Sequence, residues 1–173
     1  MTHFAFLETE WAEIATDAKK AEAVAHSDPR TACFYARRAL ELSVQWLYRV
    51  EPSLKAPYDT SLSSMIHTPE FRKLVGPAIL TKAKLIKDLG NTAVHTTRAL
   101  RSQDGPTAVR ELFHFTYWLA RTYGRKSRPD PALAFRIDQL PVTPAPSQTQ
   151  AQLQKLEEQL AERDRKLEEL AKG

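Results

Sequence analysis

The segment SDPRTACFYARRALELSVQWLYRV, residues 27–50, carries the strongest structural signal in this sequence. Asp28 can accept hydrogen bonds from the first free backbone amides of a helix, and Pro29 suits the first helical position, where no donor is needed. Apolar residues follow at helical spacing: Cys33, Ala36, Leu40, Val44 and Leu47. Because Leu42 and Trp46 widen this stripe, we predict that residues 29–50 form the most buried helix.

The same spacing predicts three more long helices within residues 1–124, over about 6–25, 78–96 and 105–124, and a short helix over 68–75. Gly76-Pro77 and Gly105-Pro106 mark their limits. Gly90, inside a predicted helix, costs roughly 1 kcal/mol relative to alanine, and a close helix crossing there would explain it. We therefore predict an all-α fold, an antiparallel four-helix bundle over residues 1–124.

The remainder divides into a linker and a helix. Residues 125–149 hold five of the eleven prolines, which predicts a Pro-rich linker. Within it Leu133, Phe135 and Ile137 alternate and would let the segment dock on the bundle as an extended strap. From residue 150 to 173, leucines at heptad positions a and d predict a coiled-coil helix: Leu153, Leu156, Leu160, Leu167 and Leu170. Because the sequence stops inside this pattern, we expect it to be the front piece of a longer protein.

Composition narrows the class of protein. The formal net charge is only +4, and the single cysteine, Cys33, excludes an internal disulfide framework and a cysteine-based zinc site. In its apolar helical context Cys33 is predicted to be a small buried side chain rather than a reactive nucleophile. No stretch is apolar enough for a bilayer span and no signal peptide is recognised, so we expect a cytoplasmic protein without membrane contact.

One helix edge could carry chemistry. Lys84, Lys87, Asn91 and His95 follow at steps of three, four and four, and Arg98 continues the edge if the helix persists. Such an edge could hold a phosphate, bind a partner or position a water for a general base. The alternative is structural, with Asn91 and His95 bonded to each other or to a neighbouring helix.

Other polar residues favour structural roles. Arg37 and Glu41 stand at i,i+4 in the 29–50 helix and are predicted to form a bridge. No metal-ligand spacing, phosphate loop or nucleophile motif is present, so neither metal nor cofactor is expected in this chain.

Three blocks of the sequence resemble one family. Residues 27–41, 85–95 and 111–123 are similar to the HEPN-like helical domain at the N-terminus of many type I restriction enzyme R (HsdR) subunits. This resemblance implies a non-catalytic interaction domain, followed by a spacer that leads to a nuclease and an ATP-dependent motor. It also implies modification and specificity subunits, DNA and a possible homodimer as partners. ATP and Mg²⁺ would belong only to the absent domains of the parent enzyme.

The wider HEPN superfamily implies an alternative. Its ribonucleases carry a motif that resembles Arg-x-x-x-x-His, in which His95 matches the histidine and Asn91 the polar position, whereas Gly90 stands at the arginine position. The alternative is therefore a HEPN-type ribonuclease or toxin-like RNA-binding protein that uses His95. A free-standing scaffold that oligomerises through the leucine heptads is a third possibility.

Overall fold

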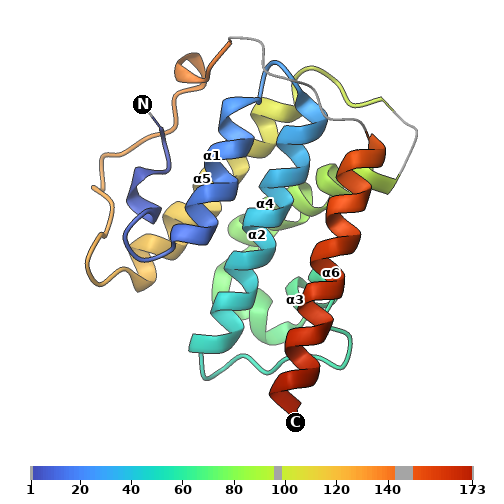
Figure 1. Ribbon diagram of the computed structural model, residues 1–173. Helices are drawn as coiled ribbons and strands as arrows, with labels where there is room; N and C mark the ends of the chain where they lie inside the picture. The colour runs from blue at the N-terminus through green and yellow to red at the C-terminus, as the bar shows by residue number, and fades with distance from the viewer. Residues whose placement is uncertain (1, 96–98, 143–149, 173) are drawn as a thin grey trace.

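The computed structural model describes residues 2–95, 99–142 and 150–172, and no strand occurs among them. The elements in chain order are η1 (Ala5–Leu7), α1 (Ala12–Ala23), α2 (Pro29–Val50), α3 (Leu62–Ile66), α4 (Pro69–His95), α5 (Asp104–Tyr123), η2 (Ile137–Gln139) and α6 (Gln150–Lys172). Figure 1 shows α1, α2, α4 and α5 gathered into one body, with α6 along its side. The predicted all-α fold is confirmed.

Helix α2 is the centre of the body. It contacts α1, α4 and α5, and the side chains of its predicted apolar stripe are all fully buried. The predicted start is also confirmed, because Pro29 is the first helical residue and the Asp28 carboxylate accepts from the backbone N–H of Thr31 at 3.2 Å. Burial on several sides at once explains why this segment is apolar over so wide an arc.

The helix predicted over residues 6–25 is wrong in its first third. Residues 5–7 form only a 3-10 turn, the α-helix begins at Ala12, and the chain between them turns. Leu7 is fully buried, and Trp11 and Ile14 are each 4% exposed, so the apolar residues of the predicted range are buried although the helix does not include them all. Their spacing of four and three therefore imitates a helical pattern without a continuous helix.

Two details of the middle of the chain stand out. The helix α3 was not predicted; Ser61 caps it by accepting from the backbone N–H of Ser64 at 3.3 Å.

The predicted break at Gly76-Pro77 is confirmed, because Gly76 has φ 84° and ψ 166° and divides α4 into two helical segments. An L side chain rarely adopts that backbone conformation, which explains the glycine.

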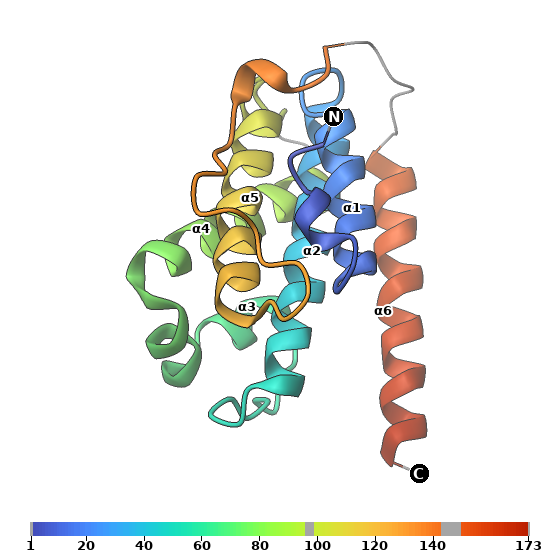
Figure 2. The same ribbon diagram turned by 90° about the vertical axis from the view of Figure 1, so that its left-hand side faces the viewer.

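Residues 125–142, which we call the strap, run beside α5 and the N-terminal segment (Figure 2). The ring of Phe135 packs 4.7 Å from that of His3 and 5.7 Å from that of Phe113, between ring centres. Leu133 and Ile137 are 39% and 51% exposed. Docking of the strap is thus confirmed for Phe135, and wrong for its two alternating neighbours.

His3 ties the strap to α1. Its Nδ1 lies 2.7 Å from a carboxylate oxygen of Glu22, and its Nε2 accepts from the backbone N–H of Arg136 at 3.2 Å. Because Nε2 accepts, Nδ1 carries the proton and donates it to Glu22. Both side chains are about 95% buried. Their hydrogen bonds therefore hold the N-terminal segment, the strap and α1 together.

Helix α6 packs its first half against the body. It contacts α4 and α2, Leu153 is fully buried and Leu156 packs against the core. Leu170, near the other end, is 76% exposed, and the side chain of Leu167 lies outside the described residues. In Figures 1 and 2 the C-terminal end of α6 extends past the other helices. The coiled coil itself stays a prediction.

Gly76→Ala should lower the free energy of unfolding by about 1–3 kcal/mol, because the new side chain would be forced into a backbone conformation that L residues avoid. Urea denaturation followed by circular dichroism measures this loss. Lys73→Ala, an exposed change in the same helix, is the control and should move the midpoint little. Equal midpoints for the two variants would show that the backbone at residue 76 can relax.

Candidate functional site

The predicted edge of α4 is only partly accessible. Lys84, Lys87 and Asn91 lie half-buried on α4, and the Nζ of Lys87 pairs with the Asp88 carboxylate at 3.0 Å. The Lys87 side chain is 15% exposed. His95 ends α4, but its side chain lies outside the described residues, as does all of Arg98. The described part of this edge is thus built into the fold on one side.

Gly90 lies at a close approach of α4 to α2. A Cβ atom at this position would fall less than 3.0 Å from three side-chain carbons of Arg37, namely Cβ, Cγ and Cδ. Real Cβ atoms essentially never approach other atoms so closely. The close crossing expected from this glycine is present, and the aliphatic stem of Arg37 fills the space that a side chain would need.

The other end of Arg37 reaches a third helix. Its Nη1 donates to the carboxylate of Glu157 on α6, and the two side chains are 14% and 19% exposed. The predicted bridge from Arg37 to Glu41 is therefore wrong: a carboxylate from a distant segment takes the guanidinium. Burial raises the pKa of Glu41, against the opposing charges of Arg37 and Arg38.

Charged side chains line the seam between α2 and α6. A cleft of about 570 Å³ lies between α2, residues 56–61 and α6, and a second of about 350 Å³ lies between α1, α2 and α6. In the latter, Arg38 Nε stands 3.7 Å from Asp17 Oδ2, and each side chain is 14% exposed. Burial raises the pKa of Asp17 despite the charge of Arg38. Acids and bases balance in the first cleft, whereas the second is lined by the cations Lys20, Arg38 and Arg163 and by one acid, Asp17.

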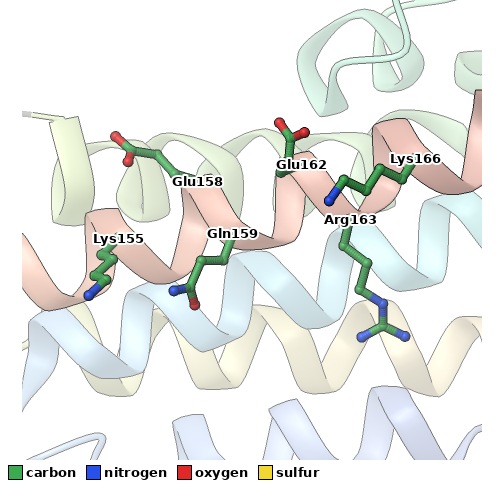
Figure 3. A pocket seen from close by; sticks show the side chains of 6 residues that line it. All are labelled: Lys155, Glu158, Gln159, Glu162, Arg163 and Lys166. Carbon is green, nitrogen blue, oxygen red and sulfur yellow. The ribbon is translucent and has the colours of Figure 1, made fainter.

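A shallow hollow on the outer face of α6 is lined by six residues shown in Figure 3: Lys155, Glu158, Gln159, Glu162, Arg163 and Lys166. All six belong to one helix, so the hollow has no opposing wall. In Figure 3 the carboxylates of Glu158 and Glu162 point to one side of the helix and the guanidinium of Arg163 to the other. This arrangement is typical of a solvated helix face.

An ionic cluster around the buried carboxylate of Glu111 joins α4 to α5, and sequence reasoning missed it. The Glu111 carboxylate accepts from Lys82 Nζ at 2.8 Å and from Arg110 Nε at 3.1 Å, with its side chain 9% exposed. Burial would raise the pKa of Glu111, but these two cations outweigh it and hold the pKa below its usual range. Because Lys82 and Glu111 are distant in sequence, no local pattern could have indicated their pairing.

Two other titratable groups lie next to the core, and the shift in the pKa of each favours its uncharged form. The Cys33 thiol lies 3.5 Å from the backbone oxygen of Asp104, and burial, with the nearby Asp104 charge, raises its pKa to about 12. A thiol so rarely ionised is a poor nucleophile. Burial also lowers the pKa of His114, helped by the charge of Lys82. Among the described residues no cluster of three or more His, Cys, Asp or Glu is arranged to hold a metal ion.

Gly90→Ala should destabilise the protein by about 1–3 kcal/mol, because the added methyl group collides with the stem of Arg37. Arg37→Gly removes that stem, so the double variant should lose less stability than the sum of the two single variants. Urea denaturation of all four proteins gives the coupling energy. Additive losses would contradict the contact.

Glu111→Gln should lower the free energy of unfolding at pH 7. The difference between variant and wild type should disappear in acid. The pKa of Glu111 in the folded protein lies below its ordinary value of 4.5, so ionised Glu111 stabilises the fold above that pH. This stabilisation disappears as the pH falls through the folded-state pKa. Thermal unfolding between pH 7 and pH 3 tests it: the gap between wild type and variant should be constant above about pH 5 and shrink below pH 4. A gap independent of pH would refute it.

Comparison with known proteins adds one family. The chain matches no curated protein and no solved structure. None of the helices in the described ranges is both long and apolar enough to cross a membrane. The family described as Domain of unknown function (DUF4145) matches residues 19–169, which include α2 to α5 and most of α6. The chain therefore belongs to the DUF4145 family.

Proposed function

We propose that this chain is a non-catalytic interaction domain of the HEPN-like four-helix type, the N-terminal part of a type I restriction R subunit. The three blocks that resemble that family fall on α2, α4 and α5. These helices pack on one another in the body of the protein, with α1 against α2 and α5, which supports a bundle of four. The parent enzyme would translocate and cleave foreign DNA with ATP and Mg²⁺ bound in its other domains.

The observation that carries this proposal is the contact between Gly90 and the side chain of Arg37. In the HEPN ribonuclease motif position 90 resembles the place of an arginine that stabilises charge at the scissile phosphate. Here the space beside Gly90 holds the stem of Arg37, and the guanidinium continues to Glu157 on α6. The contact serves to hold three helices together. A domain built in this way is suited to presenting a surface to other subunits.

A second candidate is a HEPN-type ribonuclease or RNA-binding protein that uses His95 with Asn91. One contact favours it: the Arg30 Nη1 donates to the backbone oxygen of Ala93 at 2.6 Å, so a guanidinium lies near this end of α4. That position also suits a structural role, because a cation at a helix C-terminus interacts favourably with the last carbonyl groups.

The partners of the leading proposal are the modification and specificity subunits, with the edge of α4 as the contact surface. Lys84→Glu combined with Lys87→Glu should weaken binding of those subunits at least tenfold, because it reverses two charges on that edge. Light scattering and titration with the purified subunit complex at low salt measure the loss, since screening is then smallest. The matched control is Arg72→Glu with Lys73→Glu, the same charge change at exposed positions in the first segment of α4.

Other outcomes separate the candidates. Equal binding of the edge variant and the control would remove the edge of α4 from the interface. Failure of the wild-type chain to bind the subunits, together with RNA cleavage that His95→Ala abolishes, would replace the leading proposal by the ribonuclease. Circular dichroism of each variant verifies that the helices remain.

A further inference from the structure

The turn after α5 concentrates positive charge on the surface. Arg125, Lys126 and Arg128 are all exposed, and Arg121 precedes them in the last turn of α5. We call residues 124–128 the basic turn. In the described residues no ion pair involves its three exposed cations, whereas four cations of α2 and α4 do face carboxylates: Arg37, Arg38, Lys82 and Lys87.

The backbone of this turn is held by an acid from the N-terminal segment. One oxygen of Glu10 accepts from the backbone N–H groups of Arg125, Lys126 and Ser127, at 2.8, 2.6 and 3.0 Å. These donors hold the pKa of Glu10 below its usual range, although desolvation acts in the opposite direction. The Glu10 carboxylate is thus engaged with the main chain of the turn rather than with its basic side chains.

The chain beyond the turn is fixed as well. Ser127 Oγ donates to the backbone oxygen of Phe6 at 3.3 Å, and Arg121 Nη1 donates to that of Pro129 at 2.9 Å. Tyr117 Oη reaches the backbone oxygen of Pro131 at 3.1 Å. The backbone of the turn is therefore already ordered before a ligand binds. Binding costs little conformational entropy in the turn, which favours affinity.

We infer that the basic turn is a docking surface for the phosphate backbone of duplex DNA. Cations without carboxylate partners are complementary to phosphates, and binding releases the counterions condensed on the duplex. The turn exposes no large apolar side chain, whereas the centres of protein interfaces are rich in aromatic residues and poor in lysine. It also exposes no aromatic ring on which single-stranded bases could stack. This surface is separate from the edge of α4, and the inference goes beyond the proposed function.

The test uses the full chain and a labelled 40-base-pair duplex of arbitrary sequence, with binding followed by fluorescence anisotropy. Arg125→Ser, Lys126→Ser and Arg128→Ser together should weaken binding at least tenfold at low salt. The slope of log K against log salt should also fall by up to about 2.7, from roughly 0.9 per lost phosphate contact. The control is Lys55→Ser, Arg72→Ser and Lys73→Ser, three exposed cations elsewhere, which should change affinity less than twofold.

Glu10→Ala separates a fixed turn from general attraction between charges. The variant has one negative charge fewer, so net charge alone would tighten DNA binding. If the held backbone matters, binding instead weakens at least twofold, while circular dichroism shows the helices intact. Tighter binding would contradict the role assigned to Glu10.

The remaining outcomes would overturn the inference. Equal loss in the triple variant and its control would mean that no particular surface is used. Tighter binding of a 40-nucleotide single strand than of the duplex would exclude duplex DNA as the preferred ligand. Tighter binding of polyglutamate than of the duplex would assign the turn to an acidic protein.

Discussion

The contact of Arg37 with Gly90 is the constraint on which the arrangement of helices depends. Because residue 90 has no side chain, the aliphatic part of Arg37 lies directly against α4. The guanidinium is then carried to α6, where Glu157 receives it. The missing side chain thus permits the close approach of α2 and α4 at this point, and the same arginine links both to the first half of α6. Helix α2 also contacts α1 and α5, so this crossing lies on the helix that the other long helices share.

Polar contacts inside the protein join distant segments. Lys82 pairs with Glu111 across α4 and α5, and Arg37 pairs with Glu157 across α2 and α6. His3 donates a hydrogen bond from Nδ1 to the Glu22 carboxylate and so joins the N-terminal segment to α1. A buried pair gives little net stability relative to apolar packing, but removal of one partner leaves a buried charge without compensation. Each pair therefore penalises arrangements in which its two segments are apart. The protein uses charge in this way mainly on α2 and α4.

The edge of α4 and the basic turn differ in how exposed their cations are and in what these cations contact. On the edge of α4, Lys87 is mostly buried and pairs with Asp88. In the basic turn the cations are exposed, while the backbone beneath them is fixed by Glu10. The edge of α4 suits a protein partner that packs against the helix. The basic turn suits a ligand with regularly spaced negative charges, such as the phosphate backbone of duplex DNA.

Much of the fold follows from local patterns in the sequence. Asp28-Pro29 sets the start of α2 because capping and the proline φ angle act within a few residues, and Gly76-Pro77 breaks α4 for the same kind of reason. The spacing of Leu7, Trp11 and Ile14 misled, because buried residues can have the same spacing in one helix and in a turn followed by a helix. The leucines of α6 were equally ambiguous, since a stripe that packs against the body and a stripe that pairs with another helix look alike.

For the candidate sites the division is sharper. The sequence alone indicated the stripe of α4 from Lys84 to Asn91, the close contact at Gly90 and the burial of Cys33, because each depends on helical period or on residue identity. Only the tertiary structure decided that Arg37 pairs with Glu157 rather than Glu41, and that Glu10 holds the turn at residues 125–127. These partners are more than a hundred residues apart in the chain. Their pairing depends on how the helices pack, which no short-range pattern records.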